Sequence, residues 1–144
     1  MRRGKRKPPR AVVDVNVLIS LLIGKRLRGF LHALSEQEVV LLVSEPLLAE
    51  FMDVATRPKL RKYFPVALAH ELELILTGLG ERMDVEPASP KALSRDPKDD
   101  YLLLMARKGK ADVLITGDDD LLKLERFGKT RILSPRAFTD EFLK

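Results

Sequence analysis

Cysteine is absent from this 144-residue sequence, and histidine occurs only twice. The lack of cysteine excludes disulfide bonds and thiolate metal sites, and it favours a reducing compartment, which we expect to be the cytoplasm. The two histidines, His32 and His70, lie in unrelated segments, so no histidine-rich zinc site is expected. No apolar run approaches the ~18 residues of a membrane-spanning helix, and we expect no membrane association.

Acidic residues are missing from the first ten residues, MRRGKRKPPR. The basic residues of this leader are Arg2, Arg3, Lys5, Arg6, Lys7 and Arg10. The rest of the chain has 20 basic and 21 acidic residues, a net charge of −1, so the net charge of +5 comes from the leader. The leader has no apolar stretch and does not resemble a secretory signal. Two interpretations stay open: a disordered, solvated tail, or an arm that contacts nucleic-acid phosphates.

The remaining residues, 11–144, have the length and composition of one globular domain. They are long enough to bury a core, and a chain that is 45% hydrophobic and 33% charged is ordinary for a soluble protein. Apolar runs predict strands at 11–15, 39–43, 82–86, 111–116 and 130–134, with helical segments between them, including one helix over 118–128. This alternation predicts an α/β fold with a largely parallel sheet.

Asp14 interrupts the first apolar run, AVVDV, at its carboxyl end. In open α/β sheets ligands bind outside the carboxyl ends of the strands, and Asp118 follows the strand predicted at 111–116 in the same way. Either Asp14 or Asn16 could cap the next helix; this interpretation suits Asn16 better, because Asp14 is flanked by apolar residues. A buried carboxylate is costly unless it is paired or binds a metal, so we expect a functional role for Asp14.

Helical spacing separates two further acids, Asp99 and Asp100. Asp99 shares its helix face with apolar residues three, four and seven positions later, whereas Asp100 shares its face with Arg107. Asp99 is therefore the acid expected to face inward. Spacing does not favour Glu50 over its neighbours Glu45 and Asp53.

A cluster of carboxylates without histidine or cysteine has few uses. Oxygen-only ligands suit Mg²⁺ or Mn²⁺, and two such ions can activate a water for phosphodiester cleavage. The alternative is that these acids are ordinary helix caps, because Asp118, Asp119 and Asp120 also open a predicted helix.

Four segments together resemble the PIN-domain family, and most closely its VapC-like toxin ribonucleases of toxin–antitoxin pairs. They are VVDVNVLIS, SEPLLAEFMDVATRPKLRKYF, RDPKDDYLLLMARKGKADVLITGDDDLL and RILSPRAF, and the resemblance covers residues 11–143. It implies a three-layer fold with a five-stranded parallel sheet in the order 3-2-1-4-5, which places the first strand beside the fourth. The family acids fall on Asp14, Glu50, Asp99 and Asp118, with Asn16, Thr116 and Asp120 as supporting residues. Many members have a threonine where this chain has Val15.

The resemblance implies a Mg²⁺- or Mn²⁺-dependent endoribonuclease, a toxin that a small antitoxin neutralises and that forms a homodimer. Asp14, Asp99 and Asp118 would hold metal, and Glu50 would bind a second ion or orient the attacking water. Two alternatives are a non-catalytic RNA-binding or interaction module with the same fold, and a metal-dependent phosphohydrolase of small phosphate esters.

Overall fold

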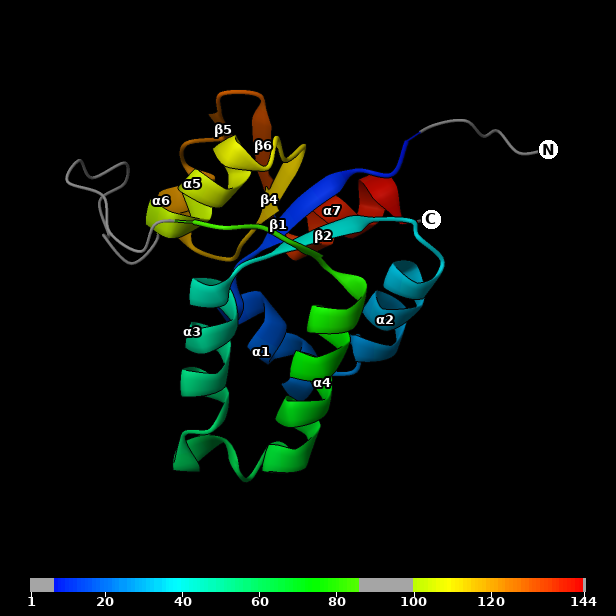
Figure 1. The fold of residues 1–144 in the computed structure, drawn as a ribbon, viewed down its shortest axis with the longest axis vertical. Coiled ribbons are helices and arrows are strands. Elements are labelled where there is room, and N and C mark those ends of the chain that lie inside the picture. The colour runs from blue at the N-terminus through cyan, green and yellow to red at the C-terminus, as the bar shows by residue number, and fades with distance from the viewer. Residues whose placement is uncertain (1–6, 86–99, 144) are drawn as a thin grey trace.

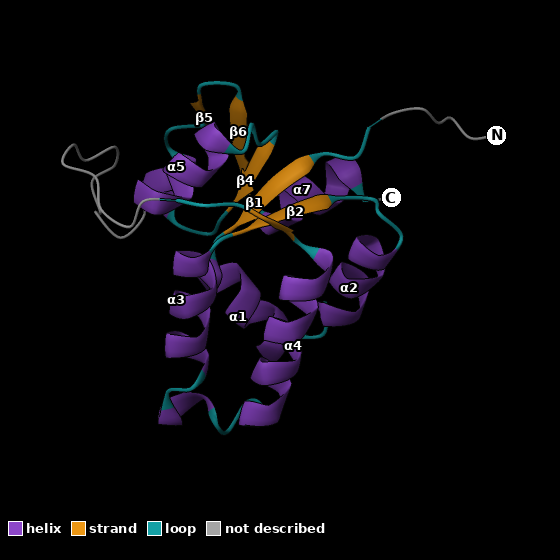
Figure 2. Ribbon diagram, viewed as in Figure 1, coloured by secondary structure: helices purple, strands orange, loops and turns teal. Residues whose placement is uncertain are grey.

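A six-stranded sheet with helices on both faces forms the centre of the protein (Figures 1 and 2). The computed structural model describes residues 7–85 and 100–143, except the side chain of Asp100. The strands are β1 (Arg10–Val13), β2 (Val40–Val43), β3 (Glu81–Arg82), β4 (Val113–Ile115), β5 (Arg126–Phe127) and β6 (Thr130–Leu133). The helices are α1 (Val15–Ile23), α2 (Leu27–Ser35), α3 (Glu45–Ala55), α4 (Val66–Leu79), α5 (Asp100–Lys108), α6 (Asp119–Leu122) and α7 (Pro135–Phe142), with a 3-10 turn, η1, at Pro58–Leu60.

The strand order is β3-β2-β1-β4-β6-β5. All neighbouring strands are parallel except β5, which pairs antiparallel with β6 at the edge. The prediction of an α/β fold with a mostly parallel sheet is confirmed, and the order 3-2-1-4-5 describes the five parallel strands. β1 lies beside β4, with Val12 opposite Leu114, so the carboxyl ends of these two strands meet at one edge.

Two element predictions are wrong. The helix predicted over 118–128 ends at Leu122, and a short hairpin of β5 and β6 follows. Glu125 and Gly128 take positive φ angles of 61° and 63°, and this left-handed backbone ends the helical run and makes the turn. Of the strand predicted at 82–86, residue 86 lies outside the described residues, and among residues 82–85 only Arg82 belongs to a strand, β3 (Glu81–Arg82).

Buried apolar side chains on both faces of the sheet explain why the strand sequences do not alternate. Val12, Leu41, Leu42 and Leu114 are at most 2% exposed. Phe51 of α3 is fully buried and belongs to the same core. The central strands are therefore fixed between two helical layers, and only their ends can present polar side chains.

Helix α3 begins at the carboxyl end of β2, as its sequence predicts. The Ser44 side chain accepts a hydrogen bond from the Leu47 amide, and Pro46 lies in the first turn. Within residues 7–85 and 100–143, no helix has the length and apolar character needed to cross a membrane.

Candidate active site

Asp14 lies where β1 passes into α1, at the carboxyl edge of the sheet. Its amide donates to the Ile115 carbonyl of β4 at 2.9 Å, and its Oδ1 accepts from the Asn16 amide at 3.2 Å. The strand ends at Val13, one residue before Asp14, so Asp14 is the N-cap of α1 and the side chain of Asn16 is exposed. The cap is therefore Asp14 and not Asn16, which corrects the sequence-based preference. At 7% exposure, Asp14 is nevertheless one of the few buried polar residues.

Thr116 joins Asp14 to the turn after β4. The buried Thr116 hydroxyl donates to Asp14 Oδ2 at 2.7 Å and accepts from the Asp118 amide at 3.0 Å. Asp118 caps α6, with its Oδ1 accepting from the Asp120 amide at 2.9 Å. This chain of hydrogen bonds fixes the ends of β1 and β4 relative to each other. Thr116 therefore gives Asp14 a hydroxyl partner, which Val15 cannot provide because its side chain has no hydroxyl.

Glu50 lies midway along α3 and is half-buried. Its Oε1 accepts a hydrogen bond from the Tyr101 hydroxyl near the start of α5. By contrast, Glu45 and Asp53 each pair with an arginine at the surface. The partner on α5 therefore distinguishes Glu50 from its neighbours, and sequence reasoning missed it because helical periodicity describes only one helix. The one available signal was Tyr101 itself, a polar aromatic residue next to the acidic pair 99–100.

Asp99 lies outside the described residues, as does the side chain of Asp100, although Asp100 begins α5. Within the described residues, no three His, Asp or Glu side chains are grouped closely enough to hold a metal ion. Asp120 is exposed and contributes its amide to Asp118. The structure thus connects Asp14 with Asp118, connects Glu50 with α5, and does not place Asp99.

The donor chemistry of Asp14 and Asp118 fits a hard divalent cation. Each carboxylate has about four lone-pair sites, and the hydrogen bonds from Asn16, Thr116 and Asp120 leave some of these sites available for a metal ion. Carboxylate and hydroxyl oxygens are ligands that Mg²⁺ and Mn²⁺ prefer over softer donors.

The basic leader meets the sheet at its opposite edge. Residues 1–6 lie outside the described residues, and Lys7 is exposed. Arg10 is the first residue of β1; its guanidinium donates to Glu81 Oε2 at 2.8 Å and to the Gly109 carbonyl at 3.0 Å. The hydrogen bond between Arg10 and Glu81 lowers the pKa of Glu81 and raises the pKa of Arg10. Arg10 is therefore bound within the fold at the amino edge, away from Asp14.

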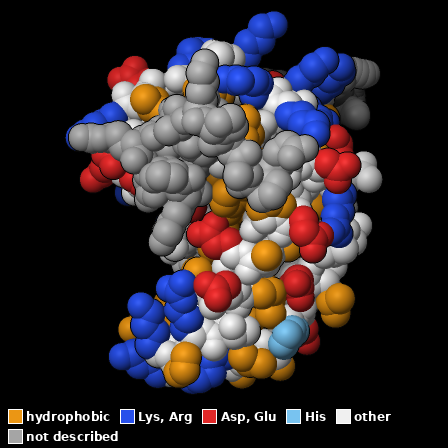
Figure 3. All heavy atoms as spheres, turned by 60° about the vertical axis from the view of Figure 1, so that its left-hand side comes forward, with side chains coloured by type: hydrophobic (Ala, Val, Ile, Leu, Met, Phe, Trp, Pro, Cys, Tyr) orange, Lys and Arg blue, Asp and Glu red, His pale blue; other side chains and the backbone are white. Residues whose placement is uncertain are grey.

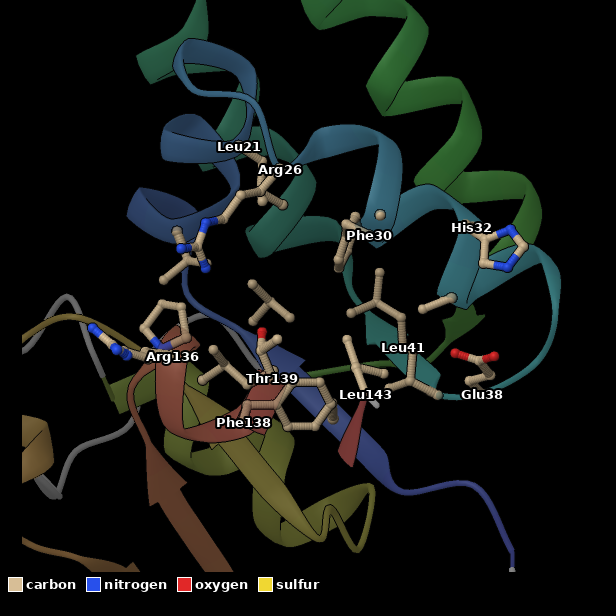
Figure 4. A pocket seen from close by; sticks show the side chains of 18 of the residues that line it. Leu21, Arg26, Phe30, His32, Glu38, Leu41, Arg136, Phe138, Thr139 and Leu143 are labelled. Atoms are coloured by element: carbon tan, nitrogen blue, oxygen red, sulfur yellow. The ribbon is translucent and has the colours of Figure 1, made fainter. Parts of the chain in front are cut away.

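A pocket of about 820 Å³ lies between α2 and α7, over one face of the sheet (Figure 4). Apolar side chains, among them Phe30, Leu41 and Phe138, line its floor and walls. Arg26 and Arg136 lie at one end of the pocket in Figure 4, and His32 and Glu38 lie at the other. Asp14, Glu50 and Asp118 are not among the lining residues, so this pocket is separate from the candidate active site.

Comparison with known proteins identifies the family. A family model described as "PIN domain" matches residues 10–120. The chain belongs to the PIN-domain family. The matched range contains all four predicted acids of this PIN domain, Asp14, Glu50, Asp99 and Asp118.

A solved structure described as "Structure of the PIN domain endonuclease Utp24" has a similar fold. The TM-score is 0.54 and the sequence identity is 17%, over 90% of this chain and 86% of the other. At this identity the match shows the fold alone. No curated protein sequence matches this PIN domain significantly, and its assignment to the VapC-like subtype stays a prediction.

Proposed function

We propose that this PIN domain is a divalent-metal-dependent endonuclease that hydrolyses RNA phosphodiesters. The observation that carries the proposal is the hydrogen-bonded chain from Asp14 through Thr116 to Asp118 at the carboxyl edge of neighbouring strands. Membership of the PIN-domain family and the fold shared with a PIN-domain endonuclease support it. RNA as the substrate is inferred from the resemblance to toxin ribonucleases.

In this proposal Asp14, Asp99 and Asp118 hold Mg²⁺ or Mn²⁺, and Glu50 binds a second ion or orients the attacking water. A metal ion held by these residues would provide an activated water and would stabilise charge on the leaving oxygen. The protein contributes orientation: the Thr116 hydroxyl holds one oxygen of Asp14, and the Tyr101 hydroxyl holds Glu50. The Asn16 amide donates to Asp14, and the Asp120 amide donates to Asp118.

We further propose the finer assignment to the VapC-like toxins, with a small antitoxin as the inhibitor, a cytoplasmic location and a homodimeric state. Exposed apolar side chains on α4 support the dimer, since Leu74 is 72% exposed and Leu79 is 50% exposed. The organisation that we propose is a basic leader over residues 1–10, whose residues before Arg10 add non-specific phosphate contacts, and residues 11–144 as the catalytic domain; Arg10 itself lies in β1 and is bound within the fold.

The experiment that tests the activity is cleavage of single-stranded RNA by the purified protein. Cleavage should stop when EDTA is added and return with Mn²⁺. Binding of RNA without cleavage would instead indicate a non-catalytic module. Hydrolysis of small phosphate esters without RNA cleavage would indicate a phosphohydrolase.

A further inference from the structure

Basic side chains gather at the end of α3 and α4 that lies away from the sheet (Figure 3). The basic tip, as we name this cluster, consists of Arg57, Lys59, Arg61 and Lys62 together with Tyr63. Residues 54–69 contain no acidic residue, although residues 11–144 as a whole carry a net charge of −1. The basic tip is therefore a local excess of positive charge on a nearly neutral domain.

The backbone of the basic tip is held in place by buried side chains. Leu60 and Phe64 are 8% and 3% exposed. Arg61 donates to the Ala55 carbonyl at the end of α3, and its guanidinium lies 5.2 Å from the centre of the Phe64 ring. Arg61 thus has a structural function, and the side chains next to it are presented on a fixed loop.

Two lysines of the basic tip are available to bind an anionic ligand. Arg57 pairs with Asp53 at 3.2 Å. Lys59 and Lys62 are exposed, and neither forms an ion pair with any residue that the structure describes. They can therefore bind an anion without first breaking a salt bridge.

Tyr63 adds an aromatic surface to this charge. Tyr63 is 51% exposed, although its ring is large and apolar. The Lys62 ammonium lies 5.3 Å from the centre of this ring. Proteins that bind single-stranded nucleic acid combine cations that contact the backbone with exposed aromatic rings on which bases stack. We propose that the basic tip binds single-stranded RNA, with Lys59 and Lys62 contacting phosphates and Tyr63 stacking on a base.

The basic tip can bind the same RNA strand as the candidate active site. Helix α3 begins next to the carboxyl edge of the sheet, carries Glu50 midway and ends at the basic tip. Its 11 residues span ~16 Å at 1.5 Å per residue, a distance that a short segment of single-stranded RNA can bridge. Without bound metal the acids at the carboxyl edge of the sheet repel phosphates, so affinity for RNA then depends on cations elsewhere on the protein. The choice of RNA as the ligand of the basic tip rests on the proposed function.

The test measures binding of a fluorescein-labelled oligouridylate by anisotropy, in EDTA so that no cleavage occurs. The double variant Lys59→Gln/Lys62→Gln should bind about tenfold more weakly at low salt and reduce the slope of log K against log salt by ~1.4, or ~0.7 per lost phosphate contact. Tyr63→Ala should weaken binding at least ~5-fold, whereas Tyr63→Phe, which keeps the ring, should stay within about twofold.

The matched control is Lys110→Gln/Lys129→Gln. It removes the same charge from two exposed lysines at the opposite, amino edge of the sheet, and it should leave affinity within about twofold of the parent. Equal losses in both double variants, or no loss in the tip variant, would overturn the proposal, as would a parent protein that binds no RNA.

Cleavage in Mn²⁺ is scored separately, so that the two proposals fail in different ways. A parent that cleaves RNA while the tip variants bind like the parent would refute the basic tip alone. Tip variants with selectively weakened binding, in a protein that never cleaves, would support the basic tip and refute the nuclease.

Discussion

Thr116 is the residue on which the geometry of the candidate active site depends most directly. Its buried hydroxyl donates a hydrogen bond to the Asp14 carboxylate and accepts one from the Asp118 amide. Thr116→Val keeps the shape and removes both hydrogen bonds, so we expect unfolding free energy to fall by about 1–3 kcal/mol, the cost of buried polar groups left without partners. RNA cleavage should fall as well, because Asp14 loses its orientation.

The control for this prediction is Thr130→Val. The Thr130 hydroxyl is also buried and donates to the Ala111 carbonyl at 2.8 Å, at the amino edge of the sheet. Urea unfolding should show a loss for both variants, but the cleavage rate of folded protein should fall only for Thr116→Val. Equal rates in the two variants would show that Thr116 stabilises the fold and does not serve the site.

Asp99 and Asp100 allow a second comparison at the residue scale. Asp→Asn removes charge with little change in shape, so Asp99→Asn should remove a metal ligand and slow cleavage by at least ~100-fold, or ~2.7 kcal/mol. Asp100→Asn should stay within a few-fold of the parent. Both rates are measured on one RNA at saturating Mn²⁺. If Asp100→Asn were the inactive variant, the helical register inferred from the sequence would be wrong by one residue.

At the scale of elements, the Arg10–Glu81 pair connects β1 with β3 across β2. Because Arg10 lowers the pKa of Glu81, the pair stabilises the fold above the ordinary glutamate pKa, and this contribution is lost as pH falls through the lowered value. Glu81 is half-exposed, so the contribution should be under about 1 kcal/mol. Glu81→Gln should lower stability slightly at pH 7, and it should lose less stability than the parent when the pH falls from 5 to 3.

Urea titrations at several pH values measure this effect, and high salt should shrink the difference between Glu81→Gln and the parent. An unchanged pH dependence in Glu81→Gln would show that the pair contributes nothing to stability.

Most elements could be predicted from the sequence because their signals are local. Continuous apolar runs mark buried strands, and Ser44 with Pro46 marks the start of α3. The early end of α6 was not predictable from hydrophobic spacing, since a left-handed residue at Glu125 gives no pattern of its own. The sequence of residues 118–128 has the pattern of an amphipathic helix, but Arg126 and Phe127 instead pair with β6 in a hairpin.

The candidate site was predictable only in part, for a related reason. Asp14 could be found because a carboxylate within an apolar run is unusual. Its link to Thr116 and the link from Glu50 to Tyr101 join residues more than 50 positions apart. Such pairings depend on which strands and helices become neighbours, and this order came from the family resemblance and not from spacing.

At the scale of the whole molecule, the exposed apolar side chains of α4 carry a prediction about assembly. We expect a homodimer at micromolar concentration, with a light-scattering mass of twice the 16.3 kDa monomer. Leu74→Asp should shift the mass toward the monomer, because it introduces a charge at the most exposed of the large apolar side chains on α4. A parent protein that runs as a monomer would contradict the proposed dimer.

The central claim is that the acids at the carboxyl edge of the sheet form a metal-dependent nuclease site. The most direct measurement is the RNA cleavage rate of Asp14→Asn at saturating Mn²⁺, beside Asp119→Asn as the control. Asn caps helices as well as Asp does, so Asp14→Asn should fold normally, and Asp119 is exposed at the start of α6. We predict a loss of at least ~100-fold for Asp14→Asn and a rate within a few-fold of the parent for Asp119→Asn. Cleavage by folded Asp14→Asn at the parent rate would contradict the claim.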